Sequence, residues 1–83
     1  MDILSSEKAV LSCLIHPERL DTVMQETGLS RPVAADILRQ LHHHGYIKCI
    51  DKQGKPMANY DADRLPQVRF TLCAKGFDAL EEN

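Results

Sequence analysis

The run His42-His43-His44 and three cysteines are the residues best suited to chemistry in this sequence, because imidazole and thiolate groups are the usual ligands of zinc. Consecutive residues of a helix point about 100° apart, so the three histidines cannot hold one ion from a single face as a pair at i and i+4 can. We therefore predict no metal site and no cofactor. We expect the histidines to occupy the last turn of a helix, where positive charge complements the helix dipole, with one of them near a bound phosphate.

The cysteines, Cys13, Cys49 and Cys73, are an odd number at wide spacing, and no Cys-x-x-Cys occurs. This pattern favours reduced thiols that act as small buried hydrophobic residues. Cys49 and Cys73 would come close if a hairpin paired the strands that carry them, so thiol or metal sensing is a secondary hypothesis. We recognise no nucleophile with a base, pair of catalytic carboxylates or glycine-rich phosphate loop, and we predict that the protein is not an enzyme.

The charged residues are unevenly distributed, although the net charge is only −2. Residues 1–29 and 77–83 are acidic overall. Between residues 30 and 76, eight basic residues outnumber four acidic ones. A basic segment between acidic ends suits a molecule that turns one surface toward nucleic acid, even though the net charge alone is unfavourable for binding phosphate.

Helices must position these residues. The spacing of the apolar residues predicts three helices, at about 6–15, 22–27 and 31–44. Ser5, Asp21 and Ser30 are suitable N-caps, and Pro17 separates the first two helices. Gly28 tolerates a left-handed conformation and begins a three-residue turn between the second and third helices. Such a turn is typical of a helix-turn-helix.

The second half of the chain changes from helical to alternating spacing. Residues 46–50 and 68–72 are β-branched or aromatic with period two and predict an antiparallel hairpin. The polar stretch 52–66 between them is too long for a tight turn, so we expect an extended, mobile loop, with local pairing near residues 57–60. A short helix over about 74–82 closes the chain.

These elements predict an α+β fold, a single winged helix-turn-helix domain over residues 1–83, because a chain of this length holds one hydrophobic core. It comprises a three-helix core, a two-stranded antiparallel wing and a short C-terminal helix. The helix-turn-helix spans about 20–44 and the wing about 46–72. The N-terminus has no basic and apolar leader, and no apolar run approaches the ~18 residues that would span a bilayer. We therefore expect a cytoplasmic protein without a membrane partner.

Two stretches of the sequence resemble the winged-helix transcription regulators of the MarR, ArsR and PadR kind. The first runs from Gly28-Leu29-Ser30 through Leu41 into Gly45-Tyr46-Ile47, and the second is Phe70-Thr71-Leu72-Cys73-Ala74-Lys75-Gly76. In those regulators a Gly-Leu-Ser turn precedes a helix that ends in spaced leucines, and Leu-Thr-x-Lys-Gly closes the wing. Cys73 stands where the capping threonine usually lies. The resemblance covers nearly the whole chain and implies the winged-helix fold.

The resemblance also implies that the third helix enters the major groove of double-stranded DNA, while the wing contacts the backbone. Carried over by position, Arg31, Val33, Ala35, Asp36 and Arg39 would face the bases or their phosphates. Ser30 and His43 are further candidate contacts at this helix. Those on the wing are Lys48, Lys52, Lys55, Arg64 and Arg69. Arg31 and Arg39 can each make a bidentate contact to guanine or a contact to phosphate. Ala35 and Asp36 depart from the family pattern, which often has a hydroxyl and a basic residue at these positions.

We therefore predict a small DNA-binding transcription regulator, which would act as a homodimer because one helix reads only a few base pairs. The alternative is a winged-helix protein-interaction module or adaptor without tight DNA binding. The acidic pI, Asp36 and an apolar front of the third helix, formed by Pro32, Val33 and Ala35, favour this alternative.

Overall fold

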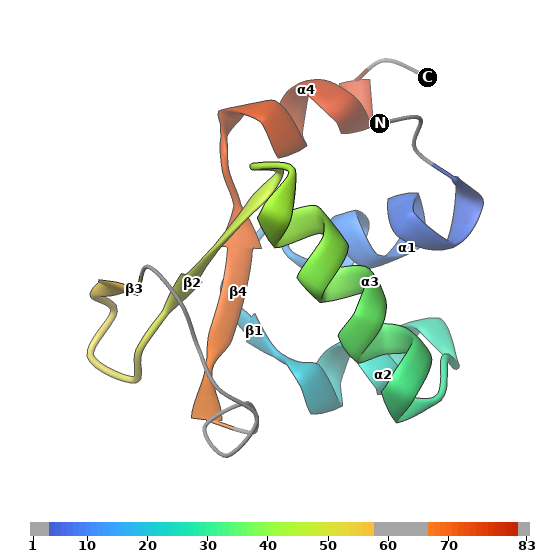
Figure 1. Cartoon of the computed structure of the whole chain (residues 1–83), viewed down its shortest axis with the longest axis horizontal. Helices are drawn as coiled ribbons and strands as arrows, with labels where there is room; N and C mark the ends of the chain where they lie inside the picture. The colour runs from blue at the N-terminus through green and yellow to red at the C-terminus, as the bar shows by residue number, and fades with distance from the viewer. Residues whose placement is uncertain (1–3, 58–66, 82–83) are drawn as a thin grey trace.

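The computed structural model describes residues 4–57 and 67–81. Within these residues the chain forms four helices and one four-stranded antiparallel sheet of strand order β1-β4-β2-β3 (Figure 1). In these same residues, none of the helices has the length and apolar character that crossing a bilayer requires. The elements in chain order are α1 (Ser5–Cys13), β1 (Glu18–Arg19), α2 (Leu20–Thr27), α3 (Arg31–His43), β2 (Ile47–Ile50), β3 (Pro56–Met57), β4 (Arg69–Leu72) and α4 (Ala74–Glu81).

Helix α1 begins with Leu4, not Ser5, at its N-cap. The backbone N–H of Leu4 donates to Glu7 Oε1 at 2.8 Å, so the glutamate satisfies a donor at the helix start although it is almost fully buried. Ser5, the predicted cap, lies in the first turn instead. Val10 and Leu11 are fully buried and hold the apolar side of the helix against the core.

The segment between α1 and α2 contains a two-residue strand that we did not predict. β1 pairs with β4 in the register Glu18↔Phe70 and Arg19↔Arg69. Because β1 continues directly into α2, Arg19 is the N-cap of that helix, and Asp21 lies in its first turn rather than at the predicted cap position. The strand thus attaches the start of the helix-turn-helix to the sheet.

The helix-turn-helix itself is confirmed. Gly28 ends α2 with a φ of 74°, and its N–H donates to the carbonyl of Met24 at 2.9 Å. A left-handed residue at this place turns the chain sharply, and Ser30 then occupies the N-cap of α3 in an extended conformation. The carbonyl of Ser30 accepts the N–H of Ala34 at 2.9 Å, whereas its hydroxyl makes no capping bond.

The wing is larger than the predicted two-stranded hairpin. β2 and β4 pair antiparallel as expected, but β3 adds a further strand on the other side of β2, with Cys49 opposite Met57. The extended loop predicted from residue 52 onward is wrong at its start, because the chain turns back at once between β2 and β3, where Gly54 has a φ of 82°. The predicted local pairing is confirmed at Met57, and residues 58–60 lie outside the described part of the chain.

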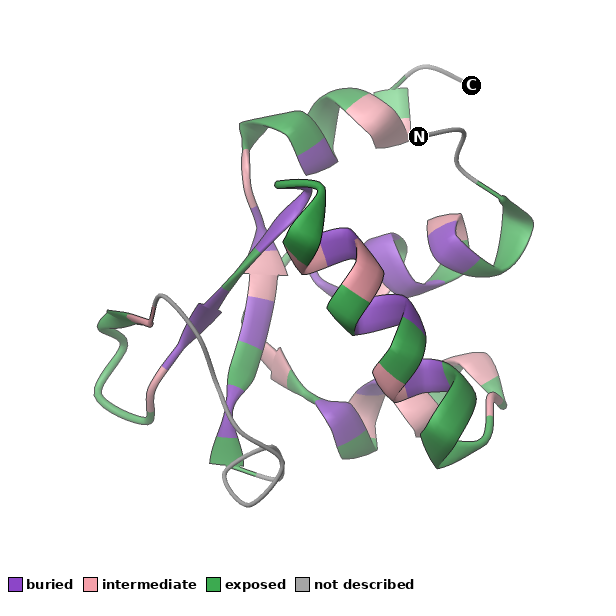
Figure 2. Ribbon diagram, in the orientation of Figure 1, coloured by how far each residue is buried: buried purple, intermediate pink, exposed green. Residues whose placement is uncertain are grey.

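The core lies between the helices and the sheet, and Figure 2 shows buried positions on the sides of α1, α2 and α3 that meet and on β2 and β4. β4 is also attached to the end of α1, because Leu72 N–H and Thr71 Oγ1 both donate to the carbonyl of Leu14, at 3.1 and 3.2 Å. The largest fully buried side chains include Leu11, Leu14, Leu20, Val23, Leu38, Leu41 and Phe70.

Helix α4 is attached to the junction between α3 and β2. Lys75 Nζ donates to the carbonyl of His44 at 2.9 Å and lies 4.5 Å from the centre of the Tyr46 ring, while Cys73 N–H donates to the carbonyl of Tyr46 at 3.0 Å. A Cβ on Gly76 would collide with this same carbonyl. The Lys-Gly part of the closing motif therefore positions the last helix, since only glycine allows so close an approach.

Candidate nucleic-acid interface

The outer side of α3 carries the residues predicted to enter the major groove. Pro32, Asp36, Arg39 and His43 are exposed and follow one another at helical spacing. We call these four residues the outer stripe; part of it shows as green segments of α3 in Figure 2. The opposite side of the helix is held in the core by Ala34, Ile37, Leu38 and Leu41.

The remaining candidates at α3 differ in how much surface they present. Ser30 and Arg31 are exposed at the start of the helix, and Val33 keeps 47% of its surface exposed. Ala35 is half-buried and packs against the core. Of the apolar front that we predicted for this helix, Pro32 and Val33 are therefore the members that present most surface.

Both arginines of α3 contact a carboxylate. Arg31 Nη1 lies 3.4 Å from Asp21 Oδ1 on α2, and Arg39 Nη2 donates to Asp36 Oδ1 within α3. The two arginine side chains remain 48% and 66% exposed. Surface ion pairs of this kind contribute about 0–1 kcal/mol, so either guanidinium can exchange its carboxylate for a phosphate or a base edge at small cost.

The histidine run lies at the C-terminal end of α3, as predicted, with His43 in the last turn and His44 at the C-cap. The rings of His43 and His44 meet edge to face at 5.2 Å. A shallow hollow beside them is lined by Arg39, Gln40, His42 and His43. In residues 4–57 and 67–81, no three His, Cys, Asp or Glu side chains are grouped as a metal ion would require.

The wing presents cations on two of its parts. Lys52 and Lys55 are exposed in the turn between β2 and β3, and Lys48 and Arg69 are exposed on β2 and β4. Arg19, which we did not predict as a contact residue, lies directly opposite Arg69 in the sheet. Two like charges in such a cross-strand pair repel each other, and an anion bound between them would relieve the repulsion. Arg64, the remaining candidate, lies outside the described residues.

The turn that holds the two lysines is organised by Asp51. Its Oδ1 accepts the backbone N–H groups of Gln53 and Lys55, at 2.8 and 2.9 Å. The N–H of Lys55, followed by that of Gln53, lowers the pKa of Asp51 below its ordinary value of 3.8, because both donors stabilise the ionised carboxylate. The ionised carboxylate therefore stabilises this turn, although the turn also carries two lysines.

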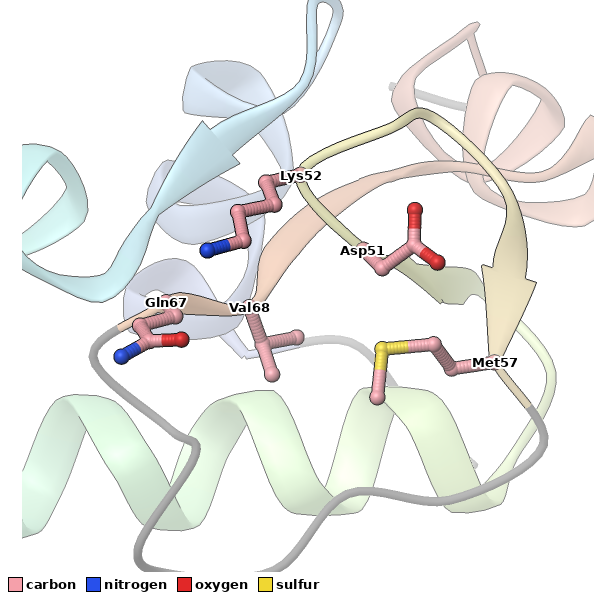
Figure 3. Close-up of a pocket in the computed structure, with 5 residues that line it drawn as sticks. All are labelled: Asp51, Lys52, Met57, Gln67 and Val68. Carbon is pink, nitrogen blue, oxygen red and sulfur yellow. The ribbon is translucent and has the colours of Figure 1, made fainter.

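A hollow of about 330 Å³ lies between this turn and the start of β4 (Figure 3). The side chains of Met57 and Val68 give it an apolar wall, and Lys52 and Gln67 place polar groups at its other side. Asp51 completes the lining, but its Oδ1 already accepts two backbone hydrogen bonds within the turn. Among the described residues that line the hollow, Lys52 is the one exposed cation, and no two groups form a pair suited to acid–base chemistry.

The cysteines are free, and Cys49 lies opposite Phe70 in the sheet, not opposite Cys73. The Cys73 thiol is nevertheless near enough to contribute to the raised pKa of Cys49. Cys49 pairs with Phe70 and has no exposed surface, and burial raises its pKa to about 12. Cys13 is half-buried, and burial followed by the nearby Glu26 carboxylate raises its pKa to about 11. Both thiols are therefore almost entirely protonated at neutral pH, which is the less nucleophilic form.

Comparison with solved structures identifies the same fold in several transcription regulators. BpsR from Bordetella bronchiseptica matches 94% of this chain with a TM-score of 0.72 and 18% identity, and 6-hydroxynicotinic acid regulates the DNA binding of that protein. The PcaV transcriptional regulator from Streptomyces coelicolor matches 94% with a TM-score of 0.73 and 20% identity. MepR from S. aureus matches 96% with a TM-score of 0.74 and 19% identity.

The likeness shows that the chain has the winged-helix fold of transcription regulators, as predicted. This chain covers 54%, 50% and 55% of the three matched chains and thus spans about half the length of each. No protein-family model and no curated protein matches the sequence. At 18–20% identity the likeness establishes the fold, and the function has to be argued from the surface residues.

Proposed function

We propose that this winged helix binds double-stranded DNA and regulates transcription, with α3 in the major groove and the wing against the phosphate backbone. The observation that carries this proposal is the outer stripe of α3, which the helix-turn-helix holds away from the core with Arg39 exposed. One protein of the same fold has DNA binding that a small molecule regulates, which supports such a role. The groove contacts would come from Ser30, Arg31, Val33, Ala35, Arg39 and His43, and the backbone contacts from Lys48, Lys52, Lys55, Arg64 and Arg69.

Two copies of the domain would act together, because a single recognition helix reads only a few base pairs. Leu4 before α1 and Phe77 on α4 are 64% and 44% exposed, and α1 packs against α4. This end of the molecule therefore offers apolar surface for a second copy while α3 remains exposed. Sedimentation equilibrium of the protein with a twofold-symmetric duplex would measure the stoichiometry.

Titration of a labelled mixed-sequence duplex by fluorescence anisotropy, repeated across a salt series, tests DNA binding. We expect a Kd below about 10⁻⁴ M at low salt and weaker binding as salt rises, because neutralised phosphates release counterions. A double change of Lys52 and Lys55 to Gln should reduce the slope of log K against log salt by about 2. A Kd weaker than about 10⁻⁴ M at low salt would exclude the proposal.

Arg39→Ala should weaken binding to a preferred duplex by about 5- to 150-fold, because the variant loses a bidentate guanine contact or a phosphate contact. Lys8→Ala on α1 removes the same charge away from the outer stripe and serves as the matched control. Anisotropy titrations of the two variants and the unchanged protein provide the comparison. Equal affinities for all three proteins would place the DNA contact on a surface other than α3.

The second candidate function is a protein-interaction module. The pairing of both arginines with Asp21 and Asp36 and the exposure of Val33 favour it, because these features lower the positive potential of the helix and leave an apolar side chain in water. A module of this kind would bind no duplex in the salt series. The titration therefore separates the two functions.

A further inference from the structure

We propose that Asp36 is a base-reading residue, and that Asp36 and Arg39 together select duplexes in which Arg39 contacts a guanine and Asp36 accepts the amino group of a cytosine. The inference rests on the proposed DNA-binding function and assigns the sequence class of the DNA. The inference assigns to Asp36 a role in selecting bases, which the family resemblance does not imply.

The geometry of the pair leaves both side chains able to make further hydrogen bonds. Asp36 and Arg39 lie three residues apart on α3, with side chains 59% and 66% exposed. Their mutual bond joins Arg39 Nη2 to Asp36 Oδ1. A guanidinium has five N–H donors and a carboxylate has a second oxygen, so the pair restrains the guanidinium while leaving donors and an acceptor that their mutual bond does not use.

Within the major groove these two groups match different atoms. Two guanidinium N–H groups match O6 and N7 of guanine, and a carboxylate oxygen accepts a hydrogen bond from N4 of cytosine. Arg39 and Asp36 are neighbours on one face of the helix, so their targets must lie close together in the groove. A G·C pair, or two adjacent pairs that contain these bases, meets this requirement.

The position of Asp36 argues that it contributes selectivity rather than affinity. A carboxylate at the centre of the outer stripe repels the phosphates of every duplex to a similar extent, whatever the sequence. Its favourable contact exists only where a base presents an amino group. Asp36 would therefore lower the affinity for every duplex, and its hydrogen bond would restore that affinity only where the contacted base has an amino group. Repulsion of this kind creates specificity.

Selection from a randomised duplex pool, followed by sequencing of the bound fraction, tests the inference. We would compare the full chain with Asp36→Ala and Asp36→Asn. Asp78→Ala serves as the control, because it removes the same charge from an exposed position on α4. We expect Asp36→Ala to bind the unselected pool more tightly, while its preference for cytosine at one position falls by about 5- to 100-fold. Asp36→Asn should shift that preference toward adenine, which an amide contacts in bidentate fashion, and Asp78→Ala should keep the original preference.

Three outcomes would overturn the inference, and they are distinguishable. Identical base preferences for the unchanged protein and Asp36→Ala would overturn it while leaving DNA binding intact. Weaker binding of Asp36→Ala to the unselected pool, with a melting temperature equal to that of the unchanged protein, would show that Asp36 supports affinity in general. Failure of the unchanged protein to bind any duplex at low salt would overturn the proposed function together with this inference.

Discussion

Lys75 connects the last helix to the end of α3 through two contacts of different kinds. Its ammonium donates to the carbonyl of His44, beyond the last turn of α3, and lies over the ring of Tyr46. We expect Lys75→Met to lower the free energy of unfolding by about 0.5–1.5 kcal/mol. Urea denaturation would measure this change, and Lys75→Arg, which keeps a cation, should lose less. Equal losses in the two variants would show that the cation is not the stabilising group.

The two ion pairs of α3 differ in how far the sequence could predict them. Asp36 and Arg39 are three residues apart in a predicted helix, and this spacing alone places them side by side. Arg31 and Asp21 belong to different helices, and their contact depends on the angle that the turn at Gly28 sets between these helices. No local rule supplies that angle, so the neutralisation of Arg31 could be seen only in the structure.

Among the elements, α4 depends most strictly on a single position. A Cβ at Gly76 would collide with the carbonyl of Tyr46 and press on the side chain of Leu72, so Gly76→Ala must displace the helix. We expect a loss of about 1–3 kcal/mol in the free energy of unfolding, although alanine is the better helix former. Asp78→Ala, at an exposed position of the same helix, should change stability by less than about 0.5 kcal/mol. Thermal and urea unfolding compare the two variants, and a Gly76→Ala protein as stable as the unchanged one would disprove this account of the joint.

The turn between β2 and β3 should be sensitive to acid. Asp51 has a pKa below its ordinary value in the folded protein, so its stabilising contribution is complete above the unfolded pKa near 3.8 and is lost as pH falls through the folded value. We expect the amide resonances of Gln53 and Lys55 to shift, and their exchange to accelerate, at pH values below about 4. NMR spectra recorded over a pH series would detect this change. Asp51→Ala should show no corresponding transition, and amides in the unchanged protein that do not respond to pH would contradict the prediction.

The helices could be predicted more completely than the strands for a physical reason. Gly28, Ser30 and the apolar stripes act within a few residues, so the turn and the buried side of α3 follow from local sequence. The strands β1 and β3 have two residues each and exist only because β4 and β2 supply their hydrogen-bond partners. Pairing of this kind depends on distant parts of the chain, and neither strand carries a local signal strong enough to predict it.

For the molecule as a whole, Cys49 offers a measure of complete unfolding. It is fully buried in β2, and its raised pKa of about 12 leaves almost no thiolate at pH 8. We expect iodoacetamide to modify Cys49 only when the core opens, whereas Cys73, which is half-buried, should react faster. Mass spectrometry of the modified peptides gives the two rates, and both thiols should react together in denaturant. Modification of Cys49 at the rate of Cys73 in native buffer would show that the sheet opens locally.

At this scale the winged-helix fold was predicted from the sequence, but the hydrogen-bond and ion-pair partners of the acidic residues were not. The basic segment between residues 30 and 76 includes Asp36 and Asp51, and Asp21 lies beside it in the structure through its contact with Arg31. Asp21 and Asp36 are ion-pair partners of arginines, whereas Asp51 accepts the backbone hydrogen bonds of a turn. Counting charges along the chain could not distinguish these roles, because they depend on where each carboxylate is directed.

The carbonyl of Tyr46 lies where the wing, the end of α3 and the start of α4 meet. It accepts a hydrogen bond from Cys73, Gly76 packs directly against it, and the ring of the same residue lies beneath Lys75. These contacts attach the start of α4 directly to the chain that leaves the end of α3. We therefore expect a force applied to α4 by another chain to reach the C-terminal end of α3 through this junction. The peptide group of Tyr46 would then be the point through which α4 and α3 are mechanically linked.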